Sequence, residues 1–150
     1  MPNTRTNSDT DVPELTREIE PGRCIQLLEA VSYGRLATVD AGEPVLVVTN
    51  HLVDSGDVYI RTRSDSQLAR LTENARVAKA VYEVDSAFPA GRSGWSVLAR
   101  GWLTREFGET RSAHLRSRLT SWAQGDRDVV LHLEVRQLTG RAVGEPSHQD

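Results

Sequence analysis

The stretch "PVLVVTNHLVDSGDVYIRTR" (residues 44–63) indicates the fold, because it contains two strand patterns joined by a tight turn. Both halves are rich in Val, Ile and Tyr, which favour extended structure, and "DSGD" (54–57) between them is typical of a hairpin turn. The preceding "GRLATVD" (34–40) is a third strand pattern, and "AGE" turns the chain from it into this stretch. Successive hairpins of this kind favour an antiparallel barrel over a doubly wound parallel sheet.

Three more strands are expected downstream, over 76–85, 95–107 and 129–143, which gives six in all. Gly101, inside the second of them, predicts a bulge or a close approach of two backbones. Apolar residues at helical spacing predict three helices, over 21–32 (Ile25, Leu28 and Val31), over 66–74, and over 110–122 (Leu115, Leu119 and Trp122). The expected fold class is therefore mainly β (α+β), a six-stranded antiparallel barrel with flanking helices.

One domain is expected, over residues 21–144. A chain of 150 residues is long enough for a domain that buries roughly 70% of its unfolded surface. Residues 1–20 are polar, with few large apolar side chains, and we expect them to form a disordered or loosely docked arm. Residues 145–150 ("EPSHQD") are expected to be a flexible tail.

The composition argues against several classes of protein. The formal net charge is -3, so a general nucleic-acid binder is not expected. The single cysteine, Cys24, excludes an internal disulfide and a Cys-based zinc site, and the spacing of the four histidines predicts no metal site. The apolar runs are too short for a membrane span and no signal peptide is recognisable, so we expect a cytoplasmic protein.

Several strands are apolar on both faces, which predicts an interface. In residues 95–103, Trp95, Val97 and Leu103 alternate with Leu98 and Trp102, and "VLVV" (45–48) is apolar throughout. A small barrel covers only the inner face of its strands, so the outer face needs a helix, a ligand or a second subunit. We predict a homodimer on this ground.

The junction "RTRSDSQL" (61–68) is a candidate phosphate site. Arg61 and Arg63 share one face of a strand, and the helix that follows offers unpaired N–H groups at its N-terminus. Two arginines beside them would add charge-assisted hydrogen bonds to a phosphate. However, Ser64 and Gln67 also fit a capping box, which satisfies the same N–H groups within the chain. The residues alone leave both interpretations open.

The remaining polar and aromatic residues suggest simpler roles. Around Ser96, "GWSVL" lacks the second glycine of a hydrolase nucleophile elbow, and Trp95 suits either core packing or stacking on an aromatic ligand. His51 ends an apolar strand, where its ring can line a pocket, whereas His132 is expected on an outward, solvated face. Arg111, Arg116 and Arg118 are expected to form a solvated helix face.

The order of these segments resembles the pyridoxamine 5'-phosphate oxidase-like family of FMN-binding split barrels. The matching pieces are "CIQLLEAVSYGRLATVD", "EPVLVVTNHLVDSGDVYIRT", "RVAKAVYEVD", "GWSVLARGWL" and "DVVLHLEVRQLTGRAV", which together cover roughly residues 21–144. The resemblance implies a six-stranded split barrel that forms a homodimer. It also implies FMN, or in some relatives a deazaflavin coenzyme or haem, in clefts at the subunit interface, with a small molecule as substrate.

The resemblance also implies eight cofactor-binding residues. By position in the family, Arg61, Thr62, Ser66 and Gln67 would surround the flavin phosphate, Thr49 and Asn50 would pass beside the ring, and Trp95 and Ser96 would lie near the cofactor across the interface. One residue departs from the family, which usually has Ser-Lys-Leu where this chain has Ser66-Gln67-Leu68. A neutral donor gives about half the hydrogen-bond energy of a charged one, which weakens phosphate binding roughly tenfold unless Arg63 or Arg70 compensates.

The sequence therefore predicts an FMN-dependent oxidoreductase of unknown substrate. The alternatives are a deazaflavin-coenzyme-dependent reductase and a non-enzymatic, cofactor-binding or regulatory split-barrel dimer, which the Gln67 departure favours. No side chain is required as an acid or base, although His51 and Tyr33 are candidate proton donors. Oxidation of pyridoxamine phosphate itself is not expected, because no cluster for a substrate phosphate follows "LTGRAV".

Overall fold

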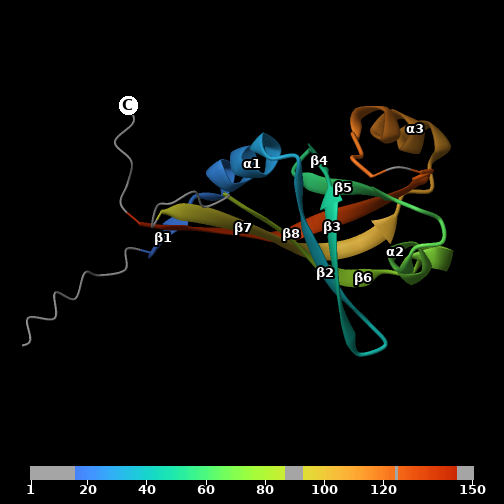
Figure 1. Cartoon of the computed structure of the whole chain (residues 1–150), viewed down its shortest axis with the longest axis horizontal. Helices are drawn as coiled ribbons and strands as arrows, with labels where there is room; N and C mark the ends of the chain where they lie inside the picture. Colours follow the sequence, from blue (N-terminus) through green and yellow to red (C-terminus); the bar gives the residue numbers. More distant parts are fainter. Residues whose placement is uncertain (1–15, 87–92, 124, 145–150) are drawn as a thin grey trace, which may run out of the picture.

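The protein is a curled antiparallel sheet with three helices (Figure 1) in a computed structural model that describes residues 16–86, 93–123 and 125–144. The strands are β1 (Thr16–Ile19), β2 (Tyr33–Asp40), β3 (Glu43–Asn50), β4 (Leu52–Asp54), β5 (Asp57–Thr62), β6 (Ala78–Asp85), β7 (Gly94–Arg105) and β8 (Val129–Val143). The helices are α1 (Pro21–Ala30), α2 (Gln67–Leu71) and α3 (Glu109–Arg118), with a 3-10 turn at Glu73–Ala75. The strand order is β3-β2-β6-β7-β8-β5-β4, with β1 on β8, and β3 also contacts β5, so the sheet curls into a half-barrel.

The predicted fold class is confirmed, but the described chain has eight strands where six were expected. One additional strand arises because the predicted strand 44–54 is interrupted at His51, which separates β3 from β4. The other is β1, which lies within the predicted N-terminal arm and pairs with the end of β8. The rest of that arm and the tail 145–150 lie outside the described residues. None of the described helices is long and apolar enough to cross a membrane.

Two tight turns form the predicted hairpins. Ala41 and Gly42 join β2 to β3 with φ values of 49° and 83°, and Ser55 and Gly56 join β4 to β5 with values of 53° and 83°. Two consecutive residues with positive φ are the signature of the turn whose twist matches that of the flanking strands. The dipeptides "AG" and "SG" thus fix the register of the barrel strands.

The longest strands, β7 and β8, form a bent ribbon that runs through the whole molecule (Figure 1). Its register shifts at Gly101, because Arg100 lies opposite Gln137 while Gly101 lies opposite Val135. Arg136 is the extra residue of the resulting bulge. A side chain at Gly101 would collide with the carbonyl oxygen of Glu134, so the predicted role of this glycine is confirmed.

The helices pack as expected in part only. In α1 the buried residues are Cys24, Leu27 and Leu28. The buried face of this helix is therefore rotated from the predicted one, and Ile25 and Val31 are only half-buried. In α3, Leu115 is buried, and so is Leu119, the C-cap residue. The backbone of Leu119 is extended, with a ψ of 106°. The chain leaves the helix at that point, so Trp122 does not continue its apolar face and is 64% exposed.

Replacing Gly101 by Ala should destabilise the fold by about 1–3 kcal/mol, because the added methyl group overlaps the backbone of β8. Urea unfolding followed by circular dichroism measures this difference. Gly22→Ala is the matched control, because a side chain at Gly22 meets nothing within 4 Å and alanine favours the helix. A Gly101→Ala protein as stable as the Gly22→Ala protein would contradict the assigned register.

Candidate functional site

A small cavity lies outside the barrel where the end of β3 approaches the loop that follows α3. We call it the seam pocket; it has a volume of about 230 Å³ and is lined by Tyr33, Val48, Thr49, Asn50, Ser121, Trp122, Ala123 and Arg127. Two of the residues that the resemblance assigned to the cofactor ring, Thr49 and Asn50, are therefore brought together here. The other wall comes from residues that the sequence did not single out.

Asn50 fixes this wall through its side-chain amide. Its Oδ1 accepts a hydrogen bond from the backbone N–H of Trp122 at 3.0 Å, and its Nδ2 donates to the carbonyl of Ser32 at 3.0 Å. The ring of Trp122 then lies 5.3 Å from that of Tyr33, at an angle of 51°. The pocket thus has two aromatic walls, a geometry that suits a flat ligand.

Arg61 braces the same loop from the opposite side. Its Nε donates to the carbonyl of Arg127 at 2.9 Å, and its Nη1 lies 3.4 Å from the carbonyls of both Arg116 and Leu119. These carbonyls belong to the end of α3 and to the chain just before β8. Arg61 was predicted to bind a phosphate, but in this structure it donates hydrogen bonds to backbone carbonyls. It therefore affects the seam pocket by positioning the loop.

Arg127 is the cation that lines the seam pocket. Its Nε is shielded from solvent and has no hydrogen-bond partner among the described residues. An unpaired buried N–H group is costly, and a negatively charged ligand is the partner that stabilises it most. Sequence periodicity did not identify Arg127, because it lies in an irregular loop whose place depends on Arg61.

The turn between β5 and α2 (61–68), where the sequence predicts a phosphate site, has most of its polar groups hydrogen-bonded within the chain. We call it the phosphate turn. Ser66, and not Ser64, is the N-cap of α2: its Oγ accepts from the N–H of Ala69 at 3.1 Å and from the Thr62 hydroxyl at 2.8 Å. The predicted Ser64–Gln67 capping box was thus wrong. Gln67 instead donates to Asp40 at 2.7 Å. The helix has five residues, too short for much of a macrodipole.

The two flanking arginines of this turn are also engaged. Arg63 makes two hydrogen bonds to the carboxylate of Asp65, at 2.8 and 2.9 Å, and these lower the pKa of Asp65. Arg70 donates to the carbonyl of Asp65 at 2.6 Å. An anion at this turn would have to compete with Asp65 for Arg63, so neither arginine is placed to replace the missing lysine.

Trp95 and Ser96 lie at the far end of the β7–β8 ribbon from this turn. Trp95 packs partly against the core, and Ser96 lines a further cavity, of about 930 Å³, together with Glu18 and Arg141. Ser96 is paired with Arg141 and Thr62 with Val129, and the part of β8 between these partners is roughly 40 Å long at 3.3 Å per residue. One chain alone therefore does not bring the two groups of predicted residues into one site.

His51 is buried beside the seam pocket. Its Nε2 lies 2.8 Å from the carbonyl of Leu28, which can only accept, so this nitrogen carries the proton. Its Nδ1 lies 2.9 Å from the hydroxyl of Tyr82, which is also 2.8 Å from the carbonyl of Thr49. Burial lowers the pKa of His51 and raises that of Tyr82. These two side chains connect α1 and β6 to the backbone of Thr49.

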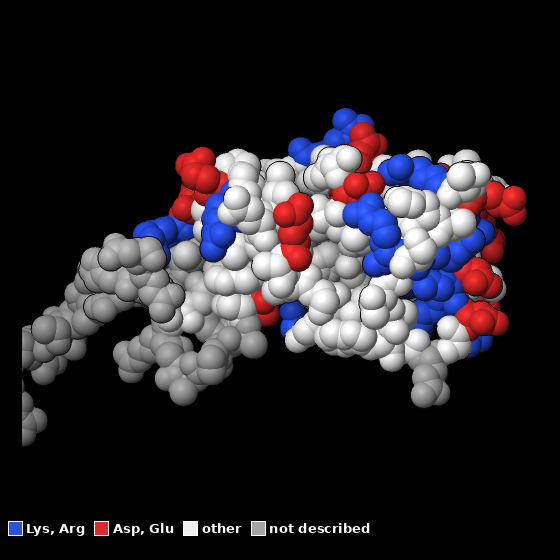
Figure 2. Space-filling model, turned by 90° about the horizontal axis from the view of Figure 1, so that it is seen from above, with Lys and Arg blue, Asp and Glu red and all other residues white. Residues whose placement is uncertain are grey.

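Two predictions about charged side chains were wrong in part. His132 is not simply solvated: its Nε2 lies 2.7 Å from Asp57, and its ring stacks on Tyr59 at 4.6 Å. Arg111 and Arg118 both lie 3.7 Å from the carboxylate of Asp54. Figure 2 shows Lys and Arg mixed with Asp and Glu at the end of the molecule that carries α3. This face is ion-paired as well as solvated.

Comparison with known proteins connects this geometry to a family. A family model described as pyridoxamine 5'-phosphate oxidase matches residues 20–142. The uncharacterized protein Rv0080 of Mycobacterium tuberculosis is 30% identical over 141 residues, which are 93% of this chain and 92% of that protein.

Two solved structures show the same fold. The FAD-binding protein of Mycobacterium smegmatis is 23% identical, with a TM-score of 0.68 over 84% of this chain and 97% of that one. A putative pyridoxamine 5'-phosphate oxidase of Corynebacterium glutamicum is 21% identical, with a TM-score of 0.71 over 85% of this chain and 97% of that one.

The burial of His51 predicts a loss of stability in mild acid. Its pKa in the folded state lies below the ordinary value of 6.5, so below that pH the unfolded chain binds a proton that the folded chain does not. The free energy of unfolding should therefore fall as the pH drops from 7.5 to 5. In His51→Gln this fall should be smaller, whereas His114→Gln, which removes an exposed histidine, should keep the wild-type slope. Equal slopes in all three proteins would contradict the prediction.

Proposed function

Because this chain belongs to the pyridoxamine 5'-phosphate oxidase family, we propose that it binds a flavin at the seam pocket and acts as an oxidoreductase, with FMN as the cofactor. One observation carries the proposal: Arg127, whose buried Nε has no hydrogen-bond partner among the described residues, lines a pocket that has aromatic walls and contains Thr49 and Asn50. A flavin combines a flat ring with an anionic tail, and this pocket offers a complementary surface for each part.

The residues of the seam pocket fit the ring. Tyr33 and Trp122 offer faces on which an aromatic system can stack, and Val48 adds an apolar edge. A bound flavin would supply hydride or electron transfer, while these residues bind it, orient it and exclude water. A volume of about 230 Å³ is below the range usual for cofactor sites, so the pocket holds part of a flavin and a second subunit completes it.

The residues that face the anionic tail differ from those that the resemblance implied. At the phosphate turn, Gln67 is bonded to Asp40 and Arg63 to Asp65. Arg127 has a donor with no partner among the described residues, and Arg61 holds this residue in place through the Arg127 carbonyl. We therefore assign the main electrostatic contact with the cofactor to Arg127. A hydrogen bond to a charged group contributes about 1.5–3 kcal/mol, enough to replace the missing lysine.

A second candidate is a barrel that binds the cofactor as a ligand without catalysis, or binds none. The hydrogen bonds of Thr62, Ser66 and Gln67 favour this second candidate, because they engage the polar groups of the phosphate turn within the chain. The structural neighbour from Mycobacterium smegmatis is named for binding FAD, so FAD is a further ligand to compare with FMN and the deazaflavin coenzyme.

We also propose that the protein is a homodimer. Large apolar side chains are exposed around the seam pocket and along β3; they are Tyr33, Leu46, Val48 and Trp122. Leu46 is 68% and Val48 64% exposed, although both lie in the middle of a strand. A second copy over this face would bury these side chains and supply the missing wall of the flavin cleft.

Titration of the purified protein with FMN, followed by flavin fluorescence, tests the cofactor proposal. Arg127→Gln should weaken binding about tenfold or more, because it removes a charged donor. Gln67→Lys should leave binding nearly unchanged if Arg127 holds the anion, but should strengthen it about tenfold if the turn does. Arg118→Gln, which removes an equal charge on α3, is the control and should bind FMN like the wild type.

A colourless protein that ignores FMN, FAD and the deazaflavin coenzyme would overturn the flavin proposal. Binding of FMN without its reduction by NADH or NADPH would leave the cofactor assignment intact and support the non-enzymatic candidate.

Light scattering after size-exclusion chromatography tests the dimer. The wild type should elute at twice the 16.6 kDa mass of the chain, and Val48→Asp or Leu46→Asp should shift it toward the monomer and weaken FMN binding with it. Val77→Asp is the control, because Val77 is similarly exposed but precedes β6, outside the proposed interface. A monomeric wild type would exclude a cleft shared between subunits.

A further inference from the structure

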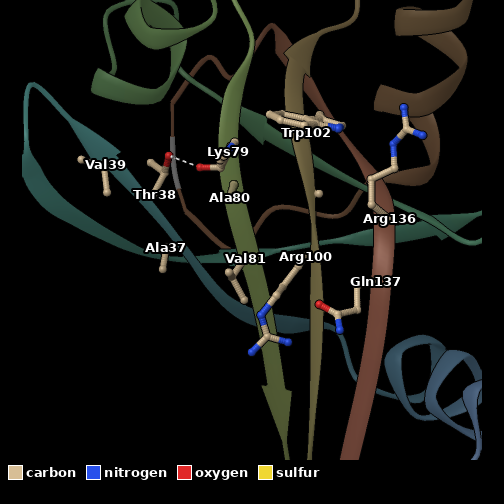
Figure 3. A pocket seen from close by; sticks show the side chains of 11 residues that line it. Ala37, Thr38, Val39, Lys79, Ala80, Val81, Arg100, Trp102, Arg136 and Gln137 are labelled. Carbon is tan, nitrogen blue, oxygen red and sulfur yellow. Dashed lines mark hydrogen bonds between the residues drawn. The ribbon is translucent and has the colours of Figure 1, made fainter.

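A second cavity lies on the outer face of the sheet, over β2, β6, β7 and β8 (Figure 3). We call it the basic groove; its volume is about 470 Å³. Its floor is apolar and includes Ala37, Val81 and Trp102, and its cations are Lys79, Arg100 and Arg136. No acidic residue lines it among those described, and no residue of the seam pocket contributes to it.

The strand register places these side chains on one face. Lys79 is paired with Trp102, and Val81 with Arg100, so cations and apolar groups alternate across β6 and β7. The Nζ of Lys79 lies 5.3 Å from the centre of the Trp102 ring, a cation–π distance. Arg136 is the bulged residue of β8, and bulges commonly redirect a side chain in this way.

Two of the three cations have no carboxylate partner among the described residues. Arg136 is paired with Glu134 at 3.0 Å, whereas within the described part of the chain Arg100 donates to the neutral hydroxyl of Thr139, at 3.2 Å. Lys79, the only lysine of the chain, forms no ion pair with the described residues. Figure 3 shows the side chains of Val81, Arg100 and Gln137 projecting from neighbouring strands on this face. The groove therefore combines a flat apolar floor with uncompensated positive charge.

We propose that the basic groove binds an amphipathic organic anion. The apolar body of the ligand lies on Val81 and Trp102, and its carboxylate, sulfonate or phosphate is held by Lys79 and Arg100. The volume lies within the range of small-molecule sites, and the charge of the lining selects an anion.

A second copy of the chain is a poorer occupant of the groove than a small anion. A two-fold axis through the groove would bring Lys79, Arg100 and Arg136 against the same three cations of the other copy. The groove shares no lining residue with the seam pocket, although the two cavities adjoin: Ala37 of the groove pairs with Leu46, and Val48 of the seam pocket lies diagonally across from Ala37, about 7–8 Å away. The two cations that would hold the anion, Lys79 and Arg100, lie on β6 and β7, with β2 between them and β3.

Two fluorescent probes with the same aromatic body test the proposal. One, 1-anilinonaphthalene-8-sulfonate, carries a sulfonate; the other, N-phenyl-1-naphthylamine, is neutral. With the full-length protein, Lys79→Gln and Arg100→Gln should each weaken binding of the anionic probe about fivefold or more, and should leave the neutral probe unaffected. Trp102→Leu should weaken both. Arg118→Gln, an equal loss of charge outside the groove, should change neither.

Either of two results would overturn the proposal. One is equal affinity of the wild type and the Lys79→Gln/Arg100→Gln double variant for the sulfonated probe; the other is an equal loss in Arg118→Gln, which would show a general charge effect. A folded double variant, checked by circular dichroism, makes the comparison valid. FMN titration of the double variant should match the wild type, so this test is independent of the flavin proposal.

Discussion

The pairing of β7 with β8 is the contact on which the other elements depend, because β8 also carries β5 at one end and β1 at the other. A ribbon this long can pair with β5 at one end and with β1 at the other only if it bends. It bends at Gly101, where the two backbones approach too closely for any side chain. A second close approach, of Cys24 in α1 to Gly140 in β8, seats the first helix on the same ribbon. The bulge also determines which residues of β8 face outward, and Arg136, its extra residue, lines the basic groove.

The role of Arg61 illustrates how one long-range contact changes the meaning of a motif. Local sequence and family resemblance both suggest that Arg61 holds a phosphate. In the structure its guanidinium instead holds three carbonyls at the end of α3 and before β8. A guanidinium bonded to neutral carbonyls keeps its charge, so Arg61 still contributes positive potential near the seam pocket. In the proposed flavin site the direct contact would pass to Arg127, whose Nε has no partner among the described residues.

Local chemistry made parts of the structure predictable. The hairpins were predictable because each turn contains a glycine, Gly42 or Gly56, which readily adopts the positive φ that the turn requires. The bulge was predictable from Gly101 in the middle of a long strand. The buried face of α1 was predicted incorrectly, because Cys24 and Leu27, rather than Ile25, meet the core. The seam pocket was predictable only through Tyr33, Thr49 and Asn50, since Trp122 and Arg127 reach it from an irregular loop. Periodicity says nothing about such a loop; its position depends on Asn50 and Arg61, far away in sequence.

The outer face of the sheet carries two adjoining surfaces of different chemical character, and this difference lets both proposals hold. Leu46 and Val48 on β3 are apolar and highly exposed, and a second subunit gains most by covering them. The cations Lys79 and Arg100 lie on β6 and β7, where a second subunit would have to desolvate them without a carboxylate in return. A dimer built on β3 would therefore leave the cations of the groove uncovered. The seam pocket would lie on the covered side, so the proposed dimer would complete the flavin cleft and leave Lys79 and Arg100 free to hold a second anion.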